Sequence, residues 1–140
     1  MADASQWEEE LIADMRSNGG AVTKGPLAGH PLLLMRSHGA KSGELRQAIL
    51  TYSRDGDDYI VAGTAGGSPT APAWIYNIEA DPNVTIEQGN QTFEATARVI
   101  KDGPERDRRW TQHVTTLPWF APYPEQSGRL IPMVRLTRVG

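Results

Sequence analysis

The stretch TFEATARVI, residues 92–100, contains the pattern that decides the fold. Every second residue in it is apolar: Phe93, Ala95, Ala97 and Val99. A period of two is typical of a β-strand with one face on a core and the other in solvent. A turn at residues 88–91 separates this stretch from the apolar segment 84–87, and together they predict an antiparallel hairpin.

Other short apolar segments along the chain are also bounded by turn residues. The predicted strands are residues 31–37, 46–53, 59–63, 84–87, 92–100 and 131–138. The predicted helices are residues 5–17, 72–80 and 104–117, and a Pro- and aromatic-rich loop follows at 118–127. About six short strands joined by tight turns favour a mainly β fold, an antiparallel barrel with flanking helices.

The composition limits the class of protein. A length of 140 residues predicts a single domain, residues 1–140, and the net charge of −3 argues against a nucleic-acid partner. The chain has no cysteine, which excludes disulfides and thiolate chemistry. The spacing of His30, His38 and His113 indicates no metal site, and a solvated or capping role is expected for each. Redox chemistry would therefore need a bound cofactor.

An amphipathic helix is predicted at residues 5–17, with Ser5 in the spacing of an N-cap residue. Its apolar face would consist of Trp7, Leu11, Ile12 and Met15. We expect this face to pack on the domain, and a lid or a peripheral contact with a membrane is the alternative. The acidic N-terminus lacks the basic region of a signal peptide, and no apolar run is long enough to span a bilayer. The expected location is cytoplasmic, with membrane association left open.

The stretch HGAKSGELR, residues 38–46, lies between two predicted strands. It is not a nucleotide-binding P-loop, because Ala40 precedes Lys41 and a strand follows instead of a helix. A glycine-flanked turn could still bind an anion through inward backbone N–H groups, with charge from Lys41 and Arg46 and a hydroxyl from Ser42. On spacing alone, an ordinary solvated hairpin turn is the simpler interpretation.

Two other loops carry residue types that fit a ligand site. The glycine pair in GTAGGSPTAPAW, residues 63–74, follows a predicted strand and precedes a helix N-terminus, where a backbone can approach an anionic group closely. Three aromatic residues, Trp119, Phe120 and Tyr123, lie among prolines in the later loop. These aromatic side chains either cap a core or line a pocket for a flat ring.

In combination, these stretches resemble the deazaflavin-dependent nitroreductase family of actinobacteria, whose members use coenzyme F420. The shared order is Lys-Ser-Gly-x-x-Arg, an apolar hairpin, Gly-Gly-x-Pro-x-x-Pro-Ala-Trp and Asn-x-x-Ala-Asp/Asn-Pro-x-Val. In this chain the motifs are Lys41-Ser42-Gly43 with Arg46, Gly66-Gly67-Ser68-Pro69 with Pro72-Ala73-Trp74, Asn77 with Ala80-Asp81-Pro82 and Val84, and a closing Arg129-Leu130-Ile131-Pro132. The resemblance covers roughly residues 30–138.

The resemblance implies a split β-barrel, FMN-binding-like, that holds coenzyme F420, a phosphate-bearing deazaflavin with a polyglutamate tail. Its anionic part would lie on the 38–46 hairpin and its ring system near the Gly-Gly loop. The implied cofactor-binding residues are Lys41, Ser42, Gly43, Arg46, Thr64, Ala65, Gly66, Gly67, Ala73 and Trp74. The implied substrate-pocket residues are Trp119, Phe120 and Tyr123, with Tyr123 as proton donor or substrate anchor.

Three positions depart from the family's pattern. Many members have Arg before Lys-Ser-Gly and Lys before Gly-Gly, where this chain has Ala40 and Ala65. Each lost charge-assisted hydrogen bond would weaken cofactor binding by roughly 1.5–3 kcal/mol. Phe120 replaces one of two loop tyrosines, so one phenol hydroxyl is missing.

The resemblance implies hydride transfer from reduced F420 to a flat conjugated acceptor, followed by protonation from Tyr123 or from solvent. The expected acceptors are quinones, enones including lactones, and nitroaromatics. Three other interpretations stay open. They are an FMN-dependent oxidoreductase on the same barrel, a non-catalytic protein that binds the cofactor or an apolar ligand, and a structural domain with no site.

Overall fold

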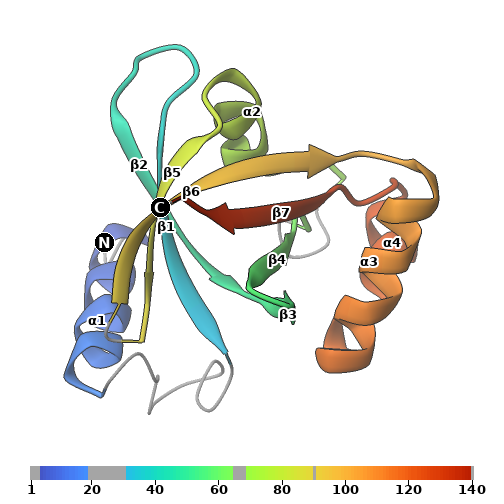
Figure 1. The fold of residues 1–140 in the computed structure, drawn as a ribbon, viewed down its shortest axis with the longest axis horizontal. Coiled ribbons are helices and arrows are strands. Elements are labelled where there is room, and N and C mark those ends of the chain that lie inside the picture. Colours follow the sequence, from blue (N-terminus) through green and yellow to red (C-terminus); the bar gives the residue numbers. More distant parts are fainter. Residues whose placement is uncertain (1–3, 19–30, 65–68, 90, 140) are drawn as a thin grey trace.

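The computed structural model describes residues 4–18, 31–64, 69–89 and 91–139. The predicted site residues Ala65, Gly66 and Gly67 lie outside the described residues, as does His30. The described chain is built around one curled antiparallel sheet, with helices on its outer sides (Figure 1).

The strands are β1 (Leu32–His38), β2 (Leu45–Thr51), β3 (Ser53–Asp55), β4 (Asp58–Ala62), β5 (Asn83–Gln88), β6 (Gln91–Ile100) and β7 (Met133–Arg138). The helices are α1 (Ala4–Ser17), α2 (Ala73–Ala80), α3 (Gly103–Thr116) and α4 (Tyr123–Ser127), and η2 (Pro118–Phe120) is a 3-10 turn. The predicted mainly β class is confirmed, with seven strands instead of about six.

The sheet order is β2-β1-β5-β6-β7-β4-β3, so the two end strands are consecutive in the chain. The prediction of one strand over residues 46–53 was wrong, because the segment bends at Tyr52 into two strands. β2 pairs with β1, while β3 pairs with β4 on the opposite end of the sheet. The sheet is therefore a curled half-barrel whose two ends are joined by the chain at Tyr52, and β2 and β3 do not pair with each other.

The alternation in residues 92–100 sets the inner face of β6. Phe93, Ala95 and Ala97 are buried in the barrel, and β5 pairs with this strand in the register Ile86 to Phe93 and Val84 to Ala95. The predicted hairpin is confirmed.

The barrel interior combines one face of each long strand with the inner side of α2. Its buried members are Leu33, Met35, Tyr59, Val61, Ile75, Ile78, Val84, Ile86, Phe93, Ala95, Ala97, Val134 and Leu136. β4 is buried on both faces, since Ile60 and Ala62 belong to a second apolar cluster beneath α3 and η2.

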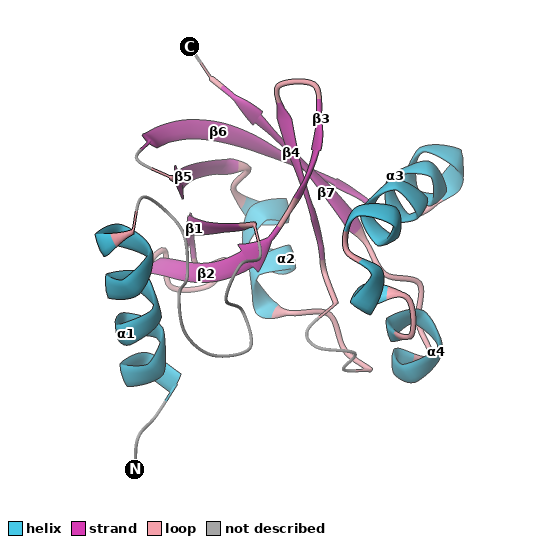
Figure 2. Cartoon of the chain, turned by 90° about the horizontal axis from the view of Figure 1, so that it is seen from below, coloured by secondary structure: helices cyan, strands magenta, loops and turns pink. Residues whose placement is uncertain are grey.

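α1 covers the outer face of β1 and β2, at the opposite end of the molecule from α3 (Figure 2). Leu11 and Met15 pack against Leu32, with Ile49 at the edge of this cluster. The prediction that the apolar face packs on the domain is confirmed for the described side chains. The helix already begins at Ala4, so the predicted N-cap position of Ser5 was wrong.

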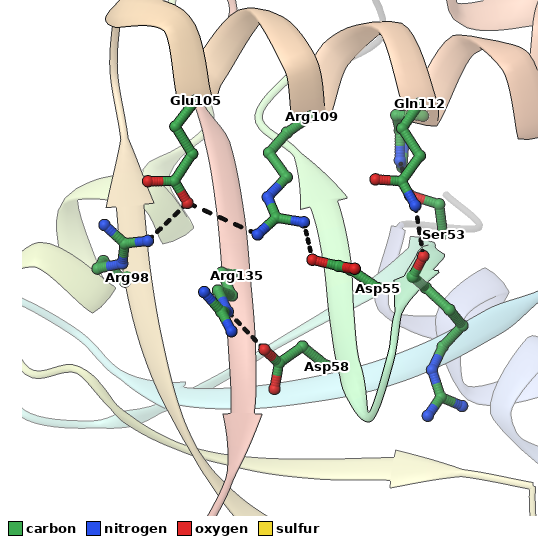
Figure 3. A network of polar contacts seen from close by, with 10 residues as sticks. Ser53, Asp55, Asp58, Arg98, Glu105, Arg109, Gln112 and Arg135 are labelled. Carbon is green, nitrogen blue, oxygen red and sulfur yellow. Dashed lines mark hydrogen bonds and ion pairs between the residues drawn. The ribbon is translucent and has the colours of Figure 1, made fainter.

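At the other end of the outer face, α3 is held by polar contacts as well as apolar ones (Figure 3). Arg109 is buried and pairs with Asp55 of β3 and with Glu105 of its own helix. The Arg109 guanidinium lowers the pKa of the Asp55 carboxyl through a hydrogen bond and through its charge. Arg98 of β6 donates to Glu105 at 2.7 Å. These contacts hold α3 on the sheet, and α3 leads directly into the aromatic loop.

The loop predicted at residues 118–127 is more regular than expected. It contains η2 and the short helix α4, which ends at Gly128 in the left-handed conformation (φ 68°). Prolines at the first turn of each segment favour these turns, because their fixed φ suits a helix start. None of the described helices combines the length and apolar composition needed to cross a bilayer.

Candidate functional site

The first cavity of interest lies between the β1–β2 hairpin and α2, and we call it the hairpin cavity. Its volume is about 820 Å³. It is lined by Ser37, Gly39, Ala40, Lys41, Ser42, Arg46, Gln47, Ala48, Ala73, Trp74, Tyr76 and Asn77. Five residues predicted to bind a cofactor therefore meet here: Lys41, Ser42, Arg46, Ala73 and Trp74.

Internal hydrogen bonds shape the hairpin. The Gly39 N–H donates to the Glu44 carbonyl at 2.8 Å, and the Gly43 N–H donates to the Gly39 carbonyl at 2.9 Å. Gly43 has φ of +70°, a left-handed conformation that glycine adopts without strain. The Glu44 N–H donates to the Ser42 hydroxyl oxygen at 3.1 Å, which leaves the Ser42 O–H available as a donor. Gly43 itself shapes the turn and is not among the cavity-lining residues.

A further bond ties the hairpin to α2. The backbone N–H of Ala40 donates to the side-chain Oδ1 of Asn77 at 3.0 Å. The N–H groups of Gly39, Ala40, Gly43 and Glu44 already have acceptors, so these four are not available to an anion nest, the possibility that the turn sequence had left open beside an ordinary hairpin. An anion in this cavity would therefore be bound by the side chains of Lys41, Ser42 and Arg46 and not by these four N–H groups.

Two cationic side chains line the hairpin cavity, Lys41 and Arg46, and they differ in whether a carboxylate already pairs with them. Lys41 has no ion-pair partner among the described residues, and its side chain is exposed. Arg46 Nη2 lies 3.4 Å from Glu44 Oε2, and both side chains are more than half exposed. A solvent-exposed pair of this kind is weak and easily exchanged for a stronger anion.

A second cavity lies beside the first and has a different character, and we call it the aromatic cavity. Its volume is about 340 Å³. It is lined by Leu32, Ala48, Ile49, Leu50, Thr51, Ala62, Thr64, Trp74, Trp119, Phe120 and Tyr123. The three predicted pocket aromatics and Thr64 meet here on a largely apolar surface, with hydroxyls from Thr51, Thr64 and Tyr123.

The aromatic wall is a set of edge-to-face ring contacts centred on Phe120. Its ring centroid lies 5.6 Å from that of Trp119 and 5.4 Å from that of Tyr123. On the side of α3 it lies 4.7 Å from the ring of His113. Phe120 is buried and Trp119 is partly exposed, so Trp119 lies toward the solvent side of the wall.

The side chain of Arg129 fixes the backbone just after β4, at Gly63 and Thr64. Arg129 Nη2 donates to the carbonyls of Gly63 and Thr64 at 2.9 and 3.0 Å. Gly63 lies so close to α2 that an added Cβ would be 2.9 Å from Ile75 Cδ1 and 3.0 Å from Pro132 Cγ. The Arg129 contact gives a structural reason for the closing Arg-Leu-Ile-Pro motif.

The two cavities adjoin, since Trp74 and Ala48 line both of them. A cavity that holds the cationic side chains of Lys41 and Arg46 is thus placed against one that is lined by aromatic rings. This arrangement suits an elongated anionic ligand on one side and a flat apolar molecule on the other.

Sequence reasoning missed several lining residues. The most informative is Asn77, which lies in a quoted motif but was given no role. The β2 residues 47–51 were also missed, because their exposure to the cavities depends on pairing with β1 and not on a local pattern. The expected solvated or capping role of His113 was wrong, since its side chain is fully buried.

Comparison with known proteins gives consistent results. A family model described as F420H(2)-dependent quinone reductase matches residues 7–138. A curated F420H(2)-dependent quinone reductase of Mycobacterium tuberculosis is 32% identical in an alignment of 147 positions that covers 97% of this chain and 99% of that protein. A solved structure titled F420-H2 dependent reductase (FDR-A) superposes with a TM-score of 0.68 at 33% identity, covering 76% of this chain and 93% of that one. Another, titled domain-swapped dimer, has a TM-score of 0.71 at 29% identity, covering 96% and 99%.

Proposed function

This chain belongs to the F420H2-dependent quinone reductase family, and from that premise we propose that the hairpin cavity binds coenzyme F420 and the aromatic cavity binds a quinone. The protein is an oxidoreductase that uses the reduced cofactor. The observation that carries the assignment of the two cavities is their shared boundary at Trp74 and Ala48.

The residues of the hairpin cavity fit an elongated polyanion. Lys41, the Ser42 hydroxyl and Arg46 offer one or more donors each, and Lys41 has no competing carboxylate among the described residues. The cavity's 820 Å³ is within the range of about 300–1,000 Å³ that ligand pockets span. These features support phosphate binding at the hairpin, with the cofactor's ring system toward Trp74.

When bound, reduced F420 supplies a hydride, so a quinone gains two electrons and needs one further proton to become the hydroquinone. The chain's own task is then to orient the quinone and to exclude water from it. Trp74 and Phe120 offer ring faces and edges for this, and the apolar β2 residues displace solvent.

Tyr123 is the residue that we assign to the proton. Its hydroxyl belongs to a side chain that lines the aromatic cavity, and no hydrogen bond of this hydroxyl is found within the described residues. It is therefore free to donate to a quinone oxygen, either as an anchor or as the proton source. Solvent remains the competing proton source.

The quinone is favoured over the other acceptors because the curated relative is named for quinone reduction, and the small ring-lined cavity suits a flat molecule. Enones and nitroaromatics share the flat conjugated shape and are secondary candidates. We infer no membrane contact through α1, since Leu11, Ile12 and Met15 are buried on the sheet side. The cytoplasmic location remains a prediction.

The direct experiment adds menadione to the purified protein with reduced F420 and follows cofactor oxidation. Turnover is expected for the wild type, with a lower kcat for Tyr123→Phe, by about a hundredfold or more if the phenol is the proton donor. Tyr52→Phe is the matched control, because Tyr52 accepts from Gln88 at 3.1 Å and lines neither cavity.

The alternatives give different results in the same experiment. An FMN enzyme would carry a visible flavin when purified and would turn over without F420. A non-catalytic binding protein would bind F420 and leave every acceptor unreduced.

A further inference from the structure

His113 of α3 is a buried polar residue that lines neither the hairpin cavity nor the aromatic cavity. Its side chain is fully buried and is surrounded by the apolar cluster beneath α3 and η2. Burial lowers the pKa of His113 from 6.5 to about 4, so the imidazole is neutral at neutral pH. An apolar side chain would fill this position without the cost of removing an imidazole from water.

Two contacts define the position of the imidazole. Nδ1 lies 2.8 Å from the Ser53 hydroxyl on β3, and Ser53 is itself buried. The ring also meets Phe120 edge to face, with centroids 4.7 Å apart and planes at 69°. Nε2 is buried and has no hydrogen bond within the described residues. The Ser53 bond is thus the directional contact that fixes how the ring is rotated.

The orientation of Phe120 depends on this ring on one side and on Trp119 and Tyr123 on the other. An edge-to-face contact holds a ring only when its partner is fixed. A hydrogen bond between α3 and β3 therefore acts on the wall of the aromatic cavity without touching a ligand.

We propose that His113 is a positioning residue that, held by Ser53, fixes Phe120 and so sets which flat acceptors fit the aromatic cavity. This inference rests on the proposed function, because it treats that cavity as the acceptor site. On this proposal, the bond between Ser53 and His113, which lies outside both cavities, determines whether two-ring or one-ring quinones are preferred.

The variants for the test are Ser53→Ala, which removes only the hydroxyl, and His113→Leu, which removes the ring. Gln112→Ala is the control, because Gln112 Nε2 donates to the Arg54 carbonyl at 2.7 Å and so also joins α3 to β3 (Figure 3). Gln112 lines neither cavity. Thermal unfolding and F420 affinity are measured for each, so that general damage to the fold is visible.

The deciding measurement is the ratio of kcat/KM for menadione to that for a one-ring benzoquinone. Ser53→Ala and His113→Leu should change this ratio by about fivefold, mainly through KM, as expected for the loss of one aromatic contact. Gln112→Ala should leave it unchanged, and F420 affinity should stay within about twofold for all three. A purely structural role for His113 would lower the melting temperature and leave the ratio unaltered, which would overturn the proposal.

A second readout separates this inference from the proposed function. The chain has two phenylalanines, so selective labelling gives two ring signals in an NMR spectrum, those of Phe93 and Phe120. Ser53→Ala should shift the Phe120 signals and leave those of Phe93, while Gln112→Ala should shift neither. If the wild type reduced no quinone, the proposed function would fail, and these shifts would still decide whether His113 positions Phe120.

Discussion

The side chain of Asn77 on α2 accepts a hydrogen bond from the backbone N–H of Ala40 in the β1–β2 hairpin, at 3.0 Å. The two residues are 37 positions apart, and this bond couples the hairpin with Lys41 and Ser42 to the helix that carries Trp74. The hydrogen bond thus fixes the wall of the hairpin cavity at Ala40. This is the position at which many members of the family with the same motifs have arginine.

Replacing Asn77 should weaken cofactor binding by loosening the hairpin. Asn77→Ala leaves the Ala40 N–H without its acceptor and should raise the F420 dissociation constant by about three- to tenfold, the size of one lost hydrogen bond. The measurement is fluorescence titration with F420. Glu79→Gln is the control on the same helix, because Glu79 pairs with Lys101 and does not line the cavity. Equal effects of both variants would mean that α2 as a whole, and not this bond, is responsible.

Charge changes on the hairpin should act in opposite directions. Lys41→Gln removes a cation that has no ion-pair partner among the described residues, and it should weaken F420 binding and reduce its salt dependence. Glu44→Gln frees Arg46 from a carboxylate 3.4 Å away and should strengthen binding by about two- to fivefold. Titrations at low and high salt check both. If Glu44→Gln weakened binding, the anion would lie elsewhere.

Gly63 should not tolerate a side chain. A Cβ at this position would lie 2.9 Å from Ile75 Cδ1 and 3.0 Å from Pro132 Cγ, so Gly63→Ala should cost about 1–3 kcal/mol in free energy of unfolding. Ile75→Val removes Cδ1 and should recover part of this loss in the Gly63→Ala background, although it destabilises the wild type. Denaturant unfolding of the four proteins checks the expectation. Additive effects would exclude a clash between these two positions.

Acid should destabilise the protein through His113. Its pKa falls from 6.5 to about 4 on folding, so between these values the unfolded chain binds a proton that the folded chain does not. The neutral His113 contributes its full stabilisation above pH 6.5. As the pH falls toward 4 this stabilisation is lost, and the free energy of unfolding decreases by about 3 kcal/mol in total.

His113→Leu should therefore flatten the dependence of unfolding free energy on pH in this window. The carboxyls on the strands packed against α3, Asp55 and Asp58, are paired with Arg109 and Arg135, and Arg54 also lies on β3. These pairs are shared by both proteins, so the difference between the two pH profiles isolates the imidazole. Parallel profiles would show that His113 binds a proton equally well in both states.

Much of the secondary structure could be predicted from local patterns. The alternation from Phe93 to Val99 predicted β6, and its hairpin with β5 has the expected position. The apolar spacing of Leu11 and Met15 predicted the buried face of α1. These patterns depend on side chains a few positions apart, which one strand or one helical turn brings onto a single face.

The errors occurred where distant strands set the outcome. Residues 46–53 contain no glycine or proline that would predict a break, yet the chain bends at Tyr52 because β2 must pair with β1 and β3 with β4. His113 was expected to be solvated or to cap a helix, and it is buried because Ser53, 60 positions away, and Phe120 both face it.

The sequence by itself determined most of the strands, the three longer helices, the two candidate ligand loops and, by resemblance, the family. Only the tertiary structure decided which N–H groups of the hairpin are occupied and which residues from β2, α2 and η2 enclose each cavity. The physical reason is that turn and strand preferences act between neighbours in the chain, whereas a cavity exists only between surfaces that folding brings together.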